Sequence, residues 1–141
     1  MKIIVTQRHE INLSLIKTRL EILRPGRSKE IIFISSLDEV LEEVAKYKNE
    51  RIIVISGQIL GLGAYGTDLA RQVKLICPDA LFFICSVMPA INDFVDGVIP
   101  KIAEDPYQSP FSLLVRVLAD DLENFTVEHL KIKYPQIKNK P

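Results

Sequence analysis

Arg51-Ile-Ile-Val-Ile-Ser-Gly-Gln-Ile-Leu-Gly-Leu-Gly-Ala-Tyr-Gly66 is the stretch from which the fold is predicted. Its four consecutive β-branched residues, Ile52 to Ile55, show no polar alternation, which is typical of a parallel strand covered by helices on both faces. The strand leads into a segment with four glycines, and a helical pattern, Thr67 to Cys77, follows directly. Ligand sites in open α/β sheets lie outside the carboxyl ends of the strands, so we expect a functional site at this glycine-rich segment.

Length and charge limit the classes of protein. The 141 residues suffice for one domain with a sizeable core and are too few for two ordinary domains. Eighteen basic and eighteen acidic side chains cancel, so we expect no nucleic-acid partner and no attraction to anionic membranes. The longest apolar run, roughly residues 80–91, is shorter than the ~20 residues of a membrane span. Strand character begins at once, without a signal-peptide pattern, so we expect a cytoplasmic protein.

Hydrophobic periodicity predicts alternating strands and helices along the chain. We expect strands at residues 2–6, 30–35, 52–55, 81–85 and 96–100, and helices at about 13–23, 37–46, 67–77 and 111–125. Residues 86–96 show no helical stripe, so the fourth helix is expected to be shortened or missing. The pattern predicts an α/β fold in three layers, with a five-stranded parallel sheet between helices.

The last segment, residues 126–141, differs in composition from the rest. Four lysines and two prolines dominate it, which predicts a basic, flexible tail after a domain that spans residues 1–125. The alternative for this tail is a docking arm for an acidic partner.

Four segments carry a family resemblance. Lys2 to Lys17 is similar to the first strand and helix of the receiver domain of two-component response regulators. Arg51 to Ser56 is similar to the strand that ends at the phosphoacceptor aspartate, and Gly66 to Arg71 to the helix start that follows. Asp96 to Lys101 is similar to the segment with the lysine of the family. The resemblance covers about residues 2–125 and implies a flavodoxin-like fold with strand order 2-1-3-4-5 and a role in signal transduction.

The chain also departs from this family at the phosphorylation site. A working receiver needs acidic side chains after the first strand and an aspartate after the third, because these bind the Mg²⁺ that offsets phosphoryl charge. The acidic pair aligns with Gln7 and Arg8, and the acceptor with Ser56, or with Gln58 if the extra loop residues are placed earlier. A guanidinium repels Mg²⁺, and a neutral amide or hydroxyl supplies little negative charge. The resemblance therefore implies a pseudo-receiver that is not phosphorylated at the standard position.

Two more positions bear on signalling. Lys101 is retained, and Ser86 or Cys85 occupies the position of the switching hydroxyl. The segment between them is too short for a regular fourth helix, and in receivers this helix contributes to the usual dimerisation and output surface. We therefore expect a remodelled surface that binds a protein partner of a signalling or regulatory pathway, or a second copy of the chain. Its expected residues are Phe94, Val95, Val98 and Ile102.

An alternative function is the binding of a small anionic ligand at the strand ends. Arg8 and Lys101 are expected to point into this crevice, where two cations without an acidic partner could hold a phosphate or carboxylate. The simpler possibility is that Arg8 pairs with a nearby acid or reaches water, and the glycine spacing matches no nucleotide-binding motif. The residues of the degenerate pocket are Gln7, Arg8, Ser56, Gln58, Ser86 and Lys101.

Catalysis is the weakest of the three classes. His9 and His129 are the two histidines of the chain, and no nucleophile, base and orienting acid converge in the predicted fold. Cys77 and Cys85 have neither the number nor the spacing of a disulfide framework or zinc site, so we interpret them as reduced, buried thiols. We expect no enzymatic activity, no cofactor and no metal.

Overall fold

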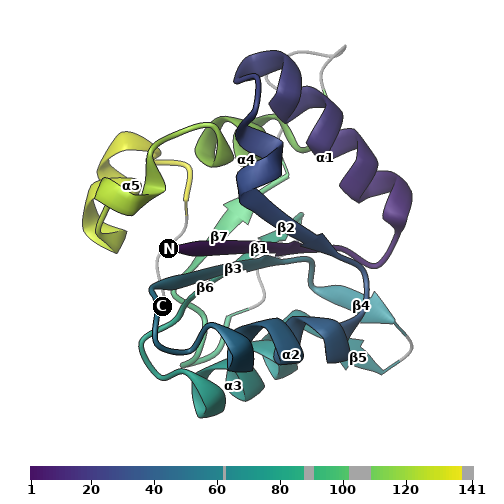
Figure 1. Ribbon diagram of the computed structural model, residues 1–141, viewed down its shortest axis with the longest axis vertical. Coiled ribbons are helices and arrows are strands. Elements are labelled where there is room, and N and C mark those ends of the chain that lie inside the picture. Colours follow the sequence, from purple (N-terminus) through teal and green to yellow (C-terminus); the bar gives the residue numbers. More distant parts are fainter. Residues whose placement is uncertain (62, 88–90, 102–108, 138–141) are drawn as a thin grey trace.

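A parallel sheet of five strands forms the centre of the computed structural model, which describes residues 1–61, 63–87, 91–101 and 109–137 (Figure 1). The strands of this sheet are β1 (Lys2–Thr6), β2 (Ile31–Ile34), β3 (Ile52–Ser56), β6 (Leu81–Ser86) and β7 (Gly97–Pro100). Their order across the sheet is β2-β1-β3-β6-β7. The predicted α/β fold with a five-stranded parallel sheet between helices is thus confirmed.

Helices cover both faces of the sheet. The helices are α1 (Glu10–Leu23), α2 (Leu37–Lys46), α3 (Gly66–Ile76), α4 (Ser112–Leu118) and α5 (Val127–Lys133). Figure 1 shows α1 and α4 on one face and α2 and α3 on the other. Alternate residues of β3 point to opposite faces: Ile53 and Ile55 join the core beneath α1 and α4, and Ile52 and Val54 join the core beneath α2 and α3. All five residues of β3 are buried, as its unbroken apolar sequence predicted.

A two-stranded hairpin follows β3, where the sequence indicated only a glycine-rich loop. It consists of β4 (Ile59–Gly61) and β5 (Ala64–Tyr65), with Ile59 opposite Tyr65. Gly63 has φ 71, a left-handed conformation that favours glycine. The predicted strand order, 2-1-3-4-5, differs from the observed one in its numbering, because the prediction did not include β4 and β5.

The connection from β6 to β7 contains no helix among its described residues, 87 and 91–96. The carboxylate of Asp96 links this connection to α3 and β6. Its Oδ2 accepts hydrogen bonds from Lys74 Nζ and from the backbone N–H of Phe82, both at 2.8 Å. The Asp96 N–H in turn donates to the Phe82 carbonyl at 2.7 Å. These bonds join α3, β6 and the start of β7.

The predicted long helix at residues 111–125 is wrong in its length. Helix α4 ends at Leu118, and a short 3₁₀ helix, η2 (Leu122–Asn124), comes before α5. The reason is a pair of arginines from the region that joins α1 to β2. Arg27 donates from Nε to the Leu118 carbonyl and from Nη2 to the Asp120 carbonyl, both at 2.8 Å, and Arg24 donates to the Ala119 carbonyl. These bonds satisfy carbonyls at the end of α4 that a longer helix would use internally.

The predicted flexible tail is also wrong for residues 127–137. Thr126 caps α5, since its hydroxyl oxygen accepts a hydrogen bond from the His129 N–H at 3.2 Å. Leu130, Tyr134 and Ile137 are buried against the core beneath α1 and α4. The Tyr134 hydroxyl donates to Asp120 Oδ2 at 2.7 Å. The segment is ordered because its apolar side chains have a core to join, and residues 138–141 of the predicted tail lie outside the described part of the chain.

In the described ranges of the chain, no helix has both the length and the apolar composition that a membrane span requires.

Candidate functional site

The carboxyl ends of four parallel strands, β1, β3, β6 and β7, lie at the same end of the sheet. The register aligns Thr6 with Ser56 and Ser56 with Ile84, and it aligns Ser86 with Pro100 at the next pair. Gln7, Gln58 and Lys101 therefore lie close to this end, in the region where the sequence predicts a site. The fold brings the predicted residues to one end of the sheet, and their side chains have different surroundings there.

Gln7 is enclosed at the end of β1 and is 3% exposed. Its amide lies over Gly57, where a Cβ atom would come within 3.1 Å of Gln7 Oε1. Gln7 Nε2 has no hydrogen-bond partner among the described residues, and the same holds for the buried Thr6 hydroxyl. A neutral, buried amide thus occupies the first position that was predicted to align with the acidic pair of a receiver.

Arg8 lies beside Gln7 in sequence and is exposed. Of the two residues that align with the acidic pair, one is therefore a buried amide and the other a solvent-exposed cation. Neither residue supplies the negative oxygens that Mg²⁺ prefers as ligands.

Ser56 is completely buried at the end of β3. Its hydroxyl donates a hydrogen bond to the Gly57 carbonyl at 2.7 Å. The side chain that was predicted to align with the phosphoacceptor is therefore bonded to the backbone of the next residue, and a hydroxyl cannot form the acyl phosphate of an aspartate.

Gln58, the alternative predicted acceptor position, accepts hydrogen bonds from the first residues of α3. Its Oε1 accepts a hydrogen bond from the Thr67 N–H at 3.2 Å, and its backbone carbonyl accepts one from the Gly66 N–H at 2.7 Å. Gly66 is needed here because a Cβ atom would lie 2.4 Å from the Gly57 carbonyl oxygen. The arrangement assigns Gln58 a structural role as a side-chain partner of the first turn of α3.

Lys101 follows β7, and its ammonium lies 5.1 Å from the ring centroid of Phe111. A cation over an aromatic face is attracted by the ring quadrupole. The backbone N–H of Lys101 donates to the carbonyl of the half-buried Ser86 at 3.4 Å. The predicted convergence of Arg8 and Lys101 on one anion is not visible, since Lys101 turns to Phe111 and Arg8 is exposed.

Cys85 is fully buried at the end of β6. Burial raises the pKa of its thiol to about 12, and the nearby Lys101 opposes this shift only in part. Because the thiolate is the reactive form, Cys85 is an inert core residue at neutral pH. This agrees with the interpretation of the two cysteines as buried thiols.

The predicted interaction surface is corrected at two of its four positions. Val95 is 0% and Val98 3% exposed, because both side chains pack inside the protein, so neither can contact a partner. Phe94 is 37% exposed, as expected for a contact residue, and Ile102 lies outside the described residues. Val87, which was not among the four named residues but lies in the same expected surface region, 86–105, is 76% exposed immediately after β6. Its position directly after a buried strand was the available signal.

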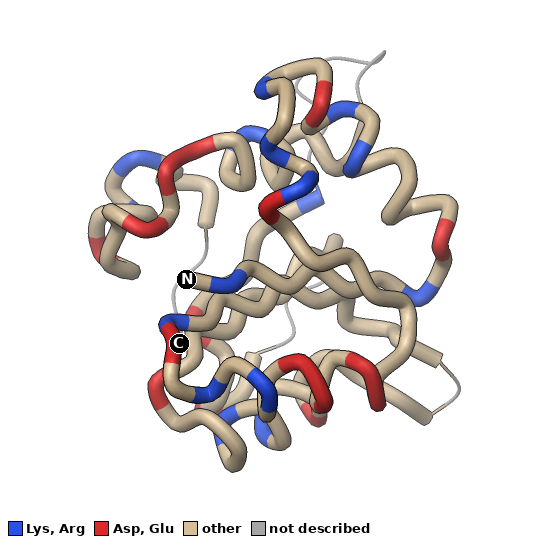
Figure 2. Tube along the Cα trace, in the orientation of Figure 1, with Lys and Arg blue, Asp and Glu red and all other residues tan. Residues whose placement is uncertain are grey.

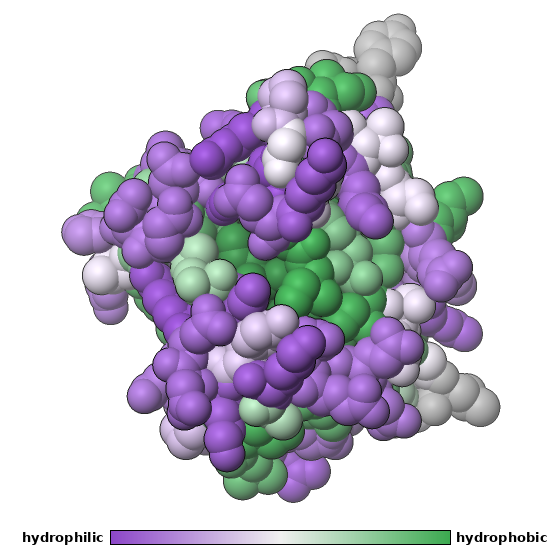
Figure 3. Space-filling view, in the orientation of Figure 1, coloured by the Kyte–Doolittle hydropathy of each residue, from purple (hydrophilic) through white to green (hydrophobic). Residues whose placement is uncertain are grey.

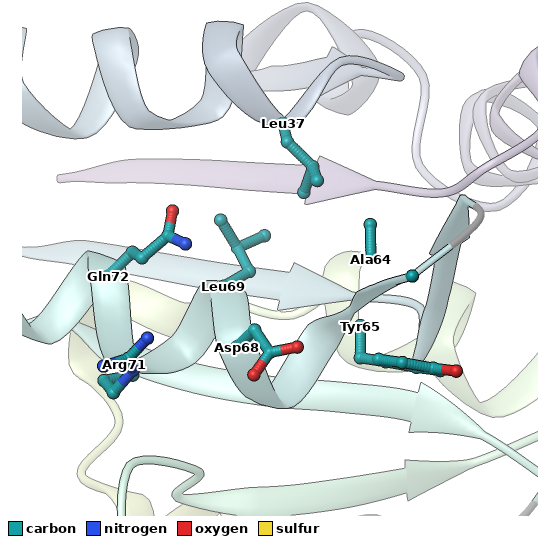
Figure 4. A pocket seen from close by; sticks show the side chains of 8 residues that line it. Leu37, Ala64, Tyr65, Asp68, Leu69, Arg71 and Gln72 are labelled. Atoms are coloured by element: carbon teal, nitrogen blue, oxygen red, sulfur yellow. The ribbon is translucent and has the colours of Figure 1, made fainter.

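A shallow pocket of about 240 Å³ lies between the hairpin, the start of α2 and α3. Figure 4 shows Leu37 reaching in from α2, opposite Leu69 and Gln72 of α3, with Tyr65 and Asp68 nearer the hairpin. Its lining residues are Leu37, Gly63, Ala64, Tyr65, Asp68, Leu69, Arg71 and Gln72. The charged and amide side chains among them are exposed, so the pocket has no buried polar group that would select a ligand.

Comparison with known proteins finds no match to this chain among family models, curated proteins or solved structures.

Proposed function

We propose that this chain is a cytoplasmic pseudo-receiver, a signalling or regulatory module that binds a protein partner without being phosphorylated. The proposal assigns the five-stranded parallel sheet to a flavodoxin-like, receiver-type fold. It is supported by the strand order β2-β1-β3-β6-β7, in which the second strand of the chain lies at one edge and the remaining strands follow on the other side of β1.

One observation carries the proposal: the three positions that are proposed to match receiver chemistry hold a buried amide, an exposed guanidinium and a buried hydroxyl that donates to the carbonyl of the next residue. These groups are Gln7, Arg8 and Ser56. Without carboxylates at these positions, Mg²⁺ and an acyl phosphate lose their ligands. A domain with an intact core and without these ligands would act by binding a protein partner instead of by accepting a phosphoryl group.

The proposed contact surface contains Val87 and Phe94, the exposed apolar residues in the described part of the connection between β6 and β7. Apolar side chains that remain exposed next to a rigid sheet are candidates for a protein interface. The proposed partner therefore presents an apolar patch.

The test is retention of partners from a soluble extract of the source cells by the immobilised chain, quantified by mass spectrometry. Val87→Asp and Phe94→Asp should each reduce retention of the specific partner at least about tenfold, which corresponds to ~1.4 kcal/mol. Leu75→Asp is the matched control, because Leu75 is exposed on α3 to the same degree as Val87. Equal retention by all variants, or retention that needs Mg²⁺ and acetyl phosphate, would contradict the proposal.

A second candidate is the binding of a small anion, and the unpartnered Nε2 donor of Gln7 beside Arg8 supports it. Titration of phosphate and acetate into the labelled protein should then shift the side-chain amide resonance of Gln7. Arg8→Ala and Lys101→Ala should weaken this binding, and a resonance that does not move in either titration removes the candidate.

A further inference from the structure

Strand β2 is an edge strand of the sheet, and it lacks the features that usually prevent an edge strand from pairing with another chain. In the described part of the chain its one strand neighbour is β1. Its sequence, Ile31-Ile-Phe-Ile34, lacks the proline or charge that natural edge strands commonly use against association. The opposite edge, β7, ends in Pro100, and its Gly97 is covered by Ile137, which lies 3.2 Å from the position of a Cβ on that glycine.

An apolar surface accompanies this edge. Figure 3 shows it in the centre of the view, over β1 and β2, between hydrophilic residues of the two helix layers. Ile32 and Phe33 are only half-buried, as are Leu37 and Leu41 of the adjacent α2. Lys17 of α1 lies over the Phe33 ring, with its ammonium 5.3 Å from the centroid. The edge therefore offers apolar side chains on both faces of the strand.

The backbone of β2 offers hydrogen-bonding groups on its outer side. The Ile31 N–H donates to the Ser28 carbonyl and thus faces away from β1. Residues of a strand alternate in the side to which they present their backbone groups, so Phe33 and Ser35 face outward too. Ile32 and Ile34 face β1. The outer donors and acceptors are then centred on Phe33.

We propose that this edge binds a second copy of the chain, with the two β2 strands antiparallel about a two-fold axis at Phe33. In this register the Phe33 N–H and carbonyl bond to the carbonyl and N–H of Phe33 of the partner subunit. The Ser35 N–H bonds to the carbonyl of Ile31 of the partner subunit. The two sheets then join into one, and the helices of each layer stay on the same side.

Charge favours a second copy over an unrelated strand. A two-fold axis at Phe33 places the start of one β2 beside the end of the other. The exposed Lys29 precedes β2, and the exposed Asp38 and Glu39 begin α2 just after it. Figure 2 shows basic residues near the connection from α1 to β2 and acidic residues along α2. Each copy thus supplies Lys29 where the other supplies Asp38 and Glu39, at both ends of the pairing. Glu30, which lies between Lys29 and β2, is paired within its own copy, since its Oε2 lies 2.9 Å from Arg27 Nη1.

This proposal does not rest on the proposed function, because the surface around Val87 and Phe94 belongs to β6 and its connection. Partner retention through that surface and self-association through β2 are separate measurements. Either can fail while the other holds.

Charge reversal at the ends of β2 tests the proposal. We would measure the dimer dissociation constant by analytical ultracentrifugation for Lys29→Glu, Asp38→Lys and the double variant. Each single reversal should raise the constant about tenfold, and the double variant should restore it to within about threefold of the original. Glu128→Lys, on the exposed face of α5, is the matched control and should leave it unchanged. A monomer at all concentrations, or reversals whose effects simply add, would overturn the proposal.

Amide hydrogen exchange distinguishes this edge from any other dimer surface. The amides of Phe33 and Ser35 should exchange slowly at high protein concentration and faster on dilution. The amides of Ile32 and Ile34, which face β1, should not depend on concentration. A dimer whose formation leaves the Phe33 and Ser35 amides unprotected would show that the contact lies elsewhere and would refute the pairing.

Discussion

At the scale of single residues, the environment of Gln7 determines which ligands the C-terminal end of the sheet can bind. The side chain is 3% exposed and its Nε2 lacks an acceptor among the described residues. An acid at this position would be a buried carboxylate without a partner among the described residues, which is unfavourable. The neutral amide is therefore compatible with the packing around it, and a carboxylate is not.

Substitution of Gln7 tests this environment. Gln7→Met removes an unsatisfied buried amide and should raise the free energy of unfolding by about 1 kcal/mol. Gln7→Glu should lower it by about 2 kcal/mol at neutral pH, because an ionised carboxylate would be enclosed. Urea denaturation measures both, with the exposed Arg8→Met as the control that should change stability by less than about 0.5 kcal/mol. A Gln7→Glu protein as stable as the parent would mean that the site can hold a cation.

Cys85 makes a prediction about alkaline pH. Burial raises its pKa to about 12 from an ordinary value of 9.0, so the folded state keeps the proton that the unfolded state releases. The stabilisation is complete below pH 9 and is lost as pH rises towards 12, with a slope of at most about 1.4 kcal/mol per pH unit. Tyr134 adds to this trend, because burial and then its bond to Asp120 raise the pKa of the phenol.

Urea denaturation between pH 8 and pH 10.5 measures the slope. Cys85→Ala should make the decline shallower, and Tyr134→Phe should do so independently. An unchanged slope in Cys85→Ala would show that the thiol titrates alike in the folded and unfolded states.

At the scale of secondary structure, Arg27 connects distant elements. Its guanidinium is buried and bonds to the carbonyls of Leu118 and Asp120 and to the Glu30 carboxylate. A cation at the carboxyl end of α4 satisfies free carbonyls and matches the helix dipole. The end of α4 is therefore set by a residue that lies 91 positions earlier in the chain.

Arg27→Met should lower the free energy of unfolding by about 3 kcal/mol, because the buried Leu118 carbonyl and the part-buried Asp120 carbonyl would lose their donor. Lys48→Met, at an exposed position outside these contacts, is the control and should change stability by less than about 0.5 kcal/mol. Differential scanning calorimetry measures both variants. A small effect of Arg27→Met would mean that water replaces the guanidinium at the end of α4.

The elements also show which features a sequence pattern can predict. Unbroken apolar runs such as Ile52–Ile55 located the strands, because burial on both faces leaves a local signature. The end of α4 left no such signature, since Arg27 acts from a distant element. The hairpin after β3 was missed because three-residue and two-residue strands carry too short a pattern, and the glycines at its turn indicated a loop.

At the scale of the whole molecule, the last described segment belongs to the fold. Leu130, Tyr134 and Ile137 are spaced four and three residues apart and are buried. The lysines in this segment suggested a solvated tail, but Leu130, Tyr134 and Ile137 join the core, and Lys133 forms an ion pair with Asp120. Composition alone therefore misplaced the domain boundary at residue 125.

Truncation after residue 125 should destabilise the protein by about 4 kcal/mol or more, because three buried side chains of about 1.5–3 kcal/mol each are removed. Truncation after residue 137 should leave stability within about 0.5 kcal/mol of the full chain. Thermal unfolding of the two shortened chains gives the comparison. Equal midpoints for both would mean that α5 rests on the core without stabilising it.

The sequence predicted the location of the candidate site better than its geometry. Parallel strands must end at the same edge, so Gln7, Ser56 and Lys101 could be placed together in advance. The direction of each side chain depends on packing partners from other elements. The ammonium of Lys101 lies over the ring of Phe111, and Val95 is enclosed in the core. Neither contact could be foreseen from the local sequence pattern.

The proposed lack of phosphorylation at this edge is tested most directly by amide NMR during titration with Mg²⁺ and beryllofluoride, which mimics an aspartyl phosphate. With no carboxylate at Gln7, Arg8 or Ser56, the resonances of Gln7, Gly57 and Lys101 should stay in place up to millimolar Mg²⁺. Shifts that saturate and require Mg²⁺ would contradict the proposed function and identify a working receiver.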